Sequence, residues 1–231
     1  MVIERDLLIS LLKLTKDGHV LIECVNQDSR IASDIVRKLL EKLQNEDLLY
    51  LNEDTVEANS DKRLRLAVKA ASLGSDIEHI STFLRWQEFE DIAALALERN
   101  GYVVAKNLRF KHANRRWEID VVGCRKPLVL CVDCKHWQRG VKPAALRKIV
   151  EAQADRAHAL ADTLPSPALK VKCVKWNKAK FIPVILSLIP SSFKFYDDVP
   201  VVPVLQLQDF LIQLPAYVEA LKYFAKGFSH L

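Results

Sequence analysis

The sequence predicts a mixed α/β fold, with a central sheet of parallel and antiparallel strands, preceded by a small and mainly helical domain. Residues 118–137 (EIDVVGCRKPLVLCVDCKHW) contain two apolar runs on either side of a turn, which predicts a buried β-hairpin. After this hairpin, strand-like and helix-like segments alternate, as they do in a sheet covered by helices. Helical periodicity dominates residues 1–75, which indicates a separate domain.

The first domain is predicted to contain three helices and a short hairpin. Four leucines recur at helical spacing near its start: Leu7, Leu8, Leu11 and Leu12. The segment SDIVRKLLEKLQNEDLL (33–49) predicts another amphipathic helix, and LLYLNEDTVEA (48–58) predicts two short strands around a polar turn. This order resembles a winged-helix domain, which would bind DNA or mediate dimerisation. In a DNA-binding domain of this kind, three cations would face outward from the third helix: Arg37, Lys38 and Lys42.

The second domain is predicted to span residues 76–231, because a new helical pattern begins after Gly74. We expect a helix at residues 83–100 and a long helix at residues 143–161. Between them we expect strands at 102–109, 117–123 and 128–135, with a basic loop at 110–116. Two further strands, FIPVILSLI and VPVVPVL, are followed by a closing helical segment from Gln208.

Composition favours a globular, cytoplasmic protein. Hydrophobic residues make up 50% of the 231 residues, which supports real cores. No run approaches ~18 uninterrupted apolar residues, and the first helical segment carries charges throughout, so we expect neither a membrane span nor a signal peptide. The five cysteines are odd in number and lie mostly within apolar runs, which favours reduced thiols.

Positive charge is concentrated in one segment of the chain. The net charge is +5, but residues 103–180 hold 18 Lys and Arg against 6 Asp and Glu, a balance of +12. A solvated basic face would explain a Lys-rich stretch on its own. Around a group of carboxylates, however, the same charge favours a polyphosphate partner.

Three charged residues interrupt the apolar hairpin. Burying an unpaired ion costs several kcal/mol, so we expect Asp120, Asp133 and Lys135 to have a function. Strand alternation places Asp133 and Lys135 on the same face. A turn near Lys126-Pro127 pairs residues whose numbers sum to about 252 or 253, which sets Asp120 opposite Asp133. Two carboxylates and an ammonium group are therefore expected to converge.

A third carboxylate lies on the helix that precedes the hairpin. On a helical wheel, Glu90 falls beside Trp86 and Leu97, at the border of the apolar arc. It would either join the site or pair with an Arg as a boundary residue. The carboxylates expected to face water are Glu88, Asp91 and Glu98.

These segments resemble a known family. FEDIAALALERNGYVV (89–104), EIDVVG (118–123) and CVDCKHW (131–137) are similar to the PD-(D/E)XK nuclease superfamily, and most nearly to its Mrr-like restriction endonucleases and the archaeal Holliday-junction resolvases. The resemblance covers residues 83–161. The Asp and Asp-x-Lys motif is short, and its place on adjacent strands after the helix makes it specific. Ile119 stands where the name of the family expects Pro.

The resemblance implies a restriction-endonuclease-like fold and a metal-dependent DNA endonuclease in repair, recombination or restriction. By motif position, the catalytic residues would be Glu90, Asp120, Asp133, Lys135 and Gln153. Asp120, Asp133 and the backbone carbonyl of Cys134 would hold Mg²⁺, or Mn²⁺ in its place. Glu90 would hold a ligand water or a second metal. Lys135 would orient or help deprotonate the attacking water.

DNA is the expected partner, together with a second copy of the chain. Exposed cations of the basic segment are expected to contact phosphates: Lys111, Arg115, Arg116, Arg139 and Lys142. Apolar residues near the C-terminus exceed what one-sided packing of a terminal helix requires, which favours a homodimer. These residues are Phe210, Leu214, Tyr217, Leu221 and Phe224.

Three alternatives compete with this interpretation. A regulatory DNA-binding protein could keep an inert nuclease-like domain as a scaffold, although the complete set of motif residues argues against it. An RNA endonuclease is a further option, because tRNA splicing endonucleases share the fold, but they resemble a Tyr/His/Lys arrangement that the carboxylates here do not match. A zinc site at Cys131 and Cys134, with Cys124 nearby, is disfavoured because no second pair with suitable spacing follows.

Overall fold

The computed structural model describes residues 2–135, 141–187, 191 and 193–228. The chain divides into two compact units, Met1–Phe89 and Glu90–Leu231. The division falls inside helix α6 (Trp86–Arg99). The sequence placed the boundary earlier, near residue 75, because Gly74 ends a helical pattern there.

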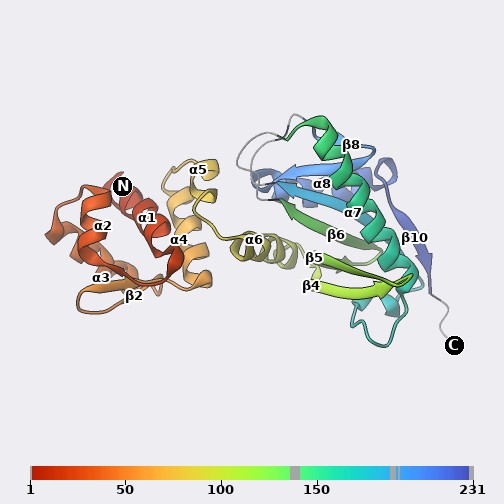
Figure 1. Ribbon diagram of the computed structural model, residues 1–231, viewed down its shortest axis with the longest axis horizontal. Helices are drawn as coiled ribbons and strands as arrows, with labels where there is room; N and C mark the ends of the chain where they lie inside the picture. Colours follow the sequence, from red (N-terminus) through yellow and green to blue (C-terminus); the bar gives the residue numbers. More distant parts are fainter. Residues whose placement is uncertain (1, 136–140, 188–190, 192, 229–231) are drawn as a thin grey trace. The chain divides into compact units, whose positions relative to one another are not determined.

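The N-terminal unit consists of helices around three short strands (Figure 1). Its elements are α1 (Val2–Leu14), β1 (Val20–Leu21), α2 (Ile22–Ser29), α3 (Ser33–Asn45), β2 (Tyr50–Leu51), β3 (Thr55–Glu57), α4 (Ser60–Ser72) and α5 (Ile77–Ser81). The strands pair antiparallel in the order β1-β3-β2. The predicted three helices and hairpin are present, and the four leucines of α1 lie in the core.

A buried ion pair joins the helices of this unit. Arg63 of α4 and Glu88 at the start of α6 are both fully buried, and the Arg63 Nε lies 2.7 Å from the Glu88 Oε1. The guanidinium also donates to three oxygens of other segments: the carbonyls of Leu12 and Phe83 and the hydroxyl of Thr15. The prediction that Glu88 faces water is wrong, because a helical wheel of α6 alone contains no information about a partner on α4.

The C-terminal unit is built on a mixed sheet. Its strands are β4 (Val103–His112), β5 (Arg115–Arg125), β6 (Leu128–Lys135), β7 (Lys178–Ser187), β8 (Phe195–Tyr196), β9 (Val199–Pro203) and β10 (Phe224–Gly227). Their order is β4-β5-β6-β7-β9-β8, and β10 pairs with β7. The β6–β7 and β7–β9 pairs are parallel, whereas β4–β5 and β5–β6 are antiparallel. The mixed central sheet that the sequence predicts is confirmed.

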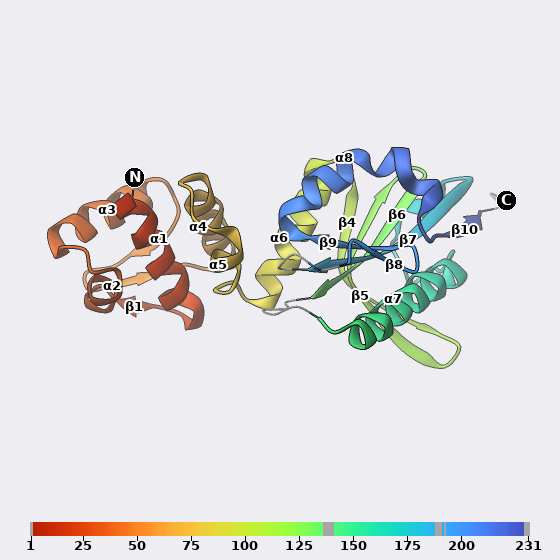
Figure 2. The same cartoon turned by 90° about the horizontal axis from the view of Figure 1, so that it is seen from above.

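Helices cover both faces of this sheet. Helix α7 (Pro143–Thr163) lies on one face, and α6 and α8 (Leu207–Tyr217) lie on the other (Figure 2). Strand β6 is buried along seven consecutive residues, from Leu128 to Cys134, as a central strand with both faces covered should be. No helix within the described ranges is long and apolar enough to cross a membrane.

Two segments differ from their predicted conformations. The predicted basic loop at 110–116 is instead the end of a hairpin, whose two-residue turn is Ala113-Asn114, with φ of 46° and 60°. Its charged residues conceal the alternating pattern of the strands. Helix α8 ends at Tyr217, a 3-10 turn follows over Val218–Ala220, and the chain then forms β10, in which Phe224 pairs with Phe181 of β7.

The buried ion pair predicts a large stability effect. We expect Arg63→Ala to lower the free energy of unfolding by about 3–5 kcal/mol, because it leaves the Glu88 carboxylate buried without its partner. Arg65→Ala is the matched control, since Arg65 lies on the same helix but makes an exposed pair with Asp47. Urea denaturation of the whole chain, followed by circular dichroism, measures both. Equal midpoints for Arg63→Ala and the wild type would contradict the prediction.

Candidate active site

The candidate site lies where strands β5 and β6 separate. Their ladder runs from Arg125↔Leu128 to Val121↔Val132, so the paired residue numbers sum to 253 and the predicted register is confirmed. Asp120 comes next on β5. Its Oδ2 accepts a hydrogen bond of 2.7 Å from the backbone amide of Cys134. The Asp120 carboxylate thus accepts the hydrogen bond of a β6 backbone amide at the point where the β5–β6 ladder ends.

Asp133 of β6 is a buried charged group of the site. Its side chain is 6% exposed, with Oδ2 2.8 Å from the Lys135 Nζ and Oδ1 3.4 Å from the Arg156 Nη1. Lys135 is half-buried, with 23% of its side chain exposed. Two cations therefore flank one carboxylate, and the Lys135 side chain still reaches solvent.

Helix α7 supports this arrangement from one face of the sheet. Gln153 is fully buried, and its Nε2 donates to the backbone carbonyl of Cys131 at 2.6 Å. Its Oε1 accepts from the Arg156 Nη1 at 3.2 Å. Gln153 therefore fixes the helix to β6 and orients the guanidinium that reaches Asp133.

Arg156 was not among the residues predicted from the sequence. One signal could have identified it: it follows Gln153 by three residues on a helix, and residues at that spacing share a face. A cation on the face that carries the predicted Gln would be expected to approach the same carboxylates.

Glu90 of α6 belongs to the same electrostatic neighbourhood. It is only 4% exposed. Burial raises the pKa of the Cys134 thiol well above its usual value, and the negative charges of Asp120, Glu90 and Asp133 raise it further. The three predicted carboxylates therefore all lie close enough to the Cys134 thiol to raise its pKa.

Asp120 is destabilised as an anion in this structure. Burial raises the pKa of its carboxyl above the usual value, and the like charge of Asp133 adds to the shift. The hydrogen bond from the Cys134 amide opposes it, as do the charges of Lys135 and Arg156. Two carboxylates thus repel each other within one partly buried site.

A backbone irregularity lies next to Asp120. Asn107 of β4 has a φ of 51°, in the left-handed region that Asn tolerates better than most residues, and the β4–β5 ladder omits the pair it would form with Asp120. Ile119 and Val122 belong to one core cluster, although residues three apart point to opposite faces of a regular strand. The alternation of β5 therefore changes phase at Asp120.

The carboxylate oxygens of Asp120 and Asp133, where β5 and β6 separate, fit a hard divalent cation. Asp133 Oδ2 is buried, its 2.8 Å contact with the Lys135 ammonium lacks hydrogen-bond geometry, and the repulsion between Asp120 and Asp133 would be relieved by a cation. No cluster of three or more His, Cys, Asp or Glu side chains within the described ranges is arranged to bind a metal. The fit is therefore to a cation that takes its other ligands from backbone oxygens or water, as Mg²⁺ does.

The cations predicted to contact nucleic acid have different surroundings. Lys111, Arg115 and Arg116 lie exposed on the β4–β5 hairpin, Lys142 is exposed before α7, and Arg139 lies outside the described residues. On α3, Arg37 donates to the carbonyl of Glu53 and Lys42 pairs with Glu4, both at 3.0 Å. Lys38 is exposed.

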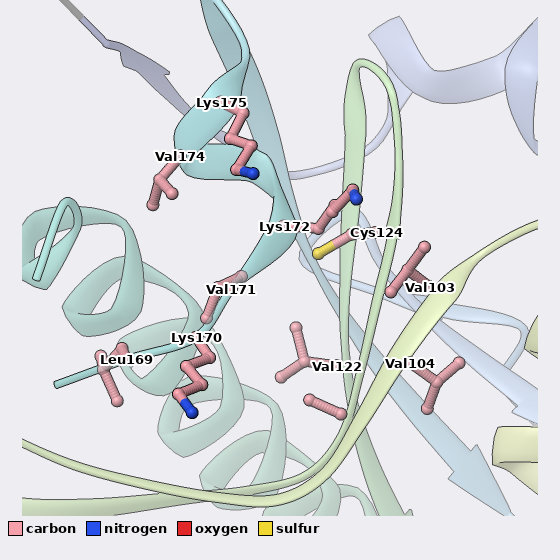
Figure 3. A pocket seen from close by; sticks show the side chains of 11 residues that line it. Val103, Val104, Val122, Cys124, Leu169, Lys170, Val171, Lys172, Val174 and Lys175 are labelled. Atoms are coloured by element: carbon pink, nitrogen blue, oxygen red, sulfur yellow. The ribbon is translucent and has the colours of Figure 1, made fainter. Parts of the chain in front are cut away.

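A separate cavity lies between the start of β4, β5 and the segment before β7 (Figure 3). Its volume is about 320 Å³, and its described lining is apolar apart from Lys170, Lys172 and Lys175. The Cys124 sulfur faces it (Figure 3). None of the predicted catalytic residues is part of this lining, so the cavity is distinct from the carboxylate site.

Comparisons with known proteins agree with the geometry. A family model described as restriction endonuclease, the Mrr catalytic domain, matches residues 82–161. A protein of Archaeoglobus fulgidus, described as uncharacterized, is 32% identical over 136 residues, which are 58% of this chain and 95% of that protein.

Three solved structures show partial likeness. A crystal structure of a protein of unknown function has 18% identity and a TM-score of 0.30, over 42% of this chain and 44% of that one. A Vibrio cholerae protein has 13% identity and a TM-score of 0.41, over 95% and 52% of the chains. The restriction endonuclease FokI has 10% identity and a TM-score of 0.35, over 93% and 44%.

This chain thus spans about half the length of each of these solved structures. The family model covers the helix, hairpin and long helix that carry Glu90, Asp120, Asp133, Lys135 and Gln153. Together with the mixed sheet, the match assigns this part of the chain to a family. Residues 82–161 of the chain belong to the restriction endonuclease-like, or PD-(D/E)XK, superfamily.

Proposed function

We propose that this protein is a metal-dependent endonuclease that hydrolyses phosphodiester bonds in DNA. The observation that carries the proposal is the convergence of Asp120, Asp133 and Lys135 where β5 and β6 separate. The match to a restriction endonuclease family over residues 82–161 supports it. So does the balance of +12 over residues 103–180, which contain the site.

The proposed metal ligands are Asp120, Asp133 and the backbone carbonyl of Cys134, with Glu90 holding a ligand water or a second ion. Mg²⁺ is the expected ion, and Mn²⁺ the expected substitute. The bound cation would supply Lewis-acid stabilisation of the negative charge that develops on the phosphate. Oxygen donors are the ligand type that such hard cations prefer.

Lys135 is proposed as the residue that meets the reacting phosphate. Its ammonium is held 2.8 Å from Asp133 while part of its side chain remains exposed, so it can contact both the site and a substrate. There the ammonium would orient the attacking water and stabilise charge on the phosphate oxygens, whereas only the neutral amine form would accept the proton of the water. Arg156 and Gln153 are proposed as positioning residues, because they act through Asp133 and the β6 backbone.

Residues 1–75 are proposed to form a winged-helix module for DNA binding or dimerisation. Helices α1, α2 and α3 and the β2–β3 hairpin follow one another in the expected order, and β1 is an additional strand that pairs with β3. Arg37 and Lys42 of α3 are engaged by Glu53 and Glu4 of the same unit. This engagement favours a packing or dimerisation role for α3 over a role in reading DNA.

Removing either charged group of the motif should stop cleavage. We expect Asp133→Asn and Lys135→Ala each to slow the cleavage of supercoiled plasmid in Mg²⁺ at least about 100-fold, because each removes a group that acts on the reacting phosphate or its metal. Asp155→Asn is the matched control, since Asp155 is an exposed carboxylate on α7. Gel assays in Mg²⁺, Mn²⁺ or EDTA measure the rates. Wild-type rates in either variant would exclude the proposed site.

DNA binding should weaken steeply as salt is added. If the basic segment neutralises several phosphates, the logarithm of the binding constant falls linearly with the logarithm of salt concentration, with a slope of about −0.9 per contact. Fluorescence anisotropy of a labelled duplex between low and moderate salt measures the slope. A slope near zero would remove nucleic acid as the partner.

A double-strand cut or symmetric junction cleavage requires two sites, so we propose a C₂ homodimer. Leu214 and Leu221 are buried in the chain's own core, which corrects their predicted place at an interface. The exposed apolar residues of this region are Phe195, Ile212 and Tyr217. We expect light scattering at micromolar concentration to give twice the mass of the chain, and Ile212→Ser with Tyr217→Ser to halve it. A monomeric wild type, with and without DNA, would leave nicking as the expected activity.

A further inference from the structure

The β4–β5 hairpin continues beyond the part of the sheet that β6 supports. Strand β5 pairs with β6 only from Val121 to Arg125, whereas it pairs with β4 as far as His112↔Arg115. Residues 108–119 thus form a two-stranded ribbon, bounded at one end by Asp120 and at the other by the Ala113-Asn114 turn. Figure 2 shows this ribbon as the yellow-green hairpin beside α7.

The two faces of the ribbon differ sharply. One face packs on the core of the unit through Phe110 and Ile119, with Leu108 and Trp117 partly buried against them. The opposite face carries charged residues that are exposed to solvent: Arg109, Lys111, Arg116 and Glu118. The packed face fixes the ribbon, so the charged face is presented on a rigid support.

Two like charges lie directly opposite each other on the exposed face. Lys111 and Arg116 are cross-strand partners, and neither makes an ion pair with any residue that the structure describes. The neighbouring pair, Arg109 and Glu118, is complementary, with 3.0 Å between Nη2 and Oε1. Like charges at paired positions destabilise a hairpin. An anion supplied from outside the chain would remove this repulsion.

The shape of the ribbon restricts which anion fits. Its turn is the tightest that joins two strands, and the Arg115 guanidinium lies over the Trp117 ring at 4.0 Å, so the tip is narrow and cationic. A major groove about 12 Å wide admits a two-stranded ribbon. Arg116 is four residues from Asp120, about 13 Å along the strand at 3.3 Å per residue. A duplex whose cleaved phosphate lies near Asp120 therefore has further phosphates within reach of the ribbon.

We propose that the β4–β5 ribbon binds duplex DNA by entering a groove, with Lys111 and Arg116 on the phosphates that border it. This proposal rests on the proposed endonuclease function and specifies its substrate as double-stranded. The ribbon then sets how the duplex is oriented at the carboxylate site. In the free protein, Lys111 and Arg116 repel each other. In the complex, each of the two cations has a phosphate as its partner.

The test compares two variants in an Asp133→Asn background, in which cleavage is expected to be at least about 100-fold slower, and in EDTA. The ribbon variant is Lys111→Thr with Arg116→Thr, since Thr keeps the strand propensity. The control is Arg99→Thr with Lys194→Thr, which removes the same charge from exposed positions of the same unit that lie outside the basic segment 103–180. Anisotropy with a labelled duplex, and with one of its strands alone, measures affinity and salt slope. Thermal melting measures stability.

We expect the ribbon variant to bind the duplex at least about tenfold more weakly and to lose about two units of salt slope, while the control and the single strand change less than about threefold. Its melting temperature should stay equal or rise, because a repulsive pair is removed. Unchanged duplex binding would overturn the proposal and leave the nuclease assignment to the cleavage assay. Equal losses in both variants, or on both forms of DNA, would also overturn it. A parent that binds no DNA would overturn both proposals.

Discussion

The buried negative charge of Asp133 is the constraint on which the candidate site depends. A carboxylate in a central strand is costly unless it is compensated, and two cations lie beside it, Lys135 on the same strand and Arg156 on α7. Gln153 in turn holds α7 to the β6 backbone and accepts a hydrogen bond from Arg156. The position of the long helix on the sheet is therefore tied to the charge that the strand carries.

The separation of β5 from β6 has a local cause as well. Asp120 uses its side chain to accept from the Cys134 amide, and opposite it Asn107 adopts a left-handed conformation that interrupts the β4–β5 ladder. On one side of Asp120 the β5–β6 ladder ends, and on its other side the β4–β5 ladder is interrupted. This break changes which face of β5 meets the core, and it lets the hairpin continue as a ribbon supported by β4 alone. The carboxylate site and the β4–β5 ribbon therefore both depend on the backbone conformation at Asp120.

Much of this arrangement could be predicted from the sequence, and the omissions have a physical pattern. The register of β5 with β6 followed from the turn and the period of two, and the burial of β6 followed from its continuous apolar run. The conformation of Asn107 and the partners of Glu88 and Arg156 depend on segments distant in sequence. Periodicity reports which face of an element is buried, but it does not report which side chain of another element meets that face.

The two buried acidic groups, Glu88 and Asp133, differ in how fully they are satisfied. Glu88 receives the Arg63 guanidinium and the Arg85 amide, so both of its oxygens have donors, as a structural ion pair requires. Asp133 has two cations nearby, yet the 2.8 Å contact of its Oδ2 with the Lys135 ammonium lacks hydrogen-bond geometry, and its neighbour Asp120 adds repulsion. This difference separates the charge of Glu88, which stabilises the fold, from that of Asp133, for which we propose a metal ion as a further partner. Lys111 and Arg116, which make no ion pair with any residue that the structure describes, likewise lack the full set of partners that Arg63 has.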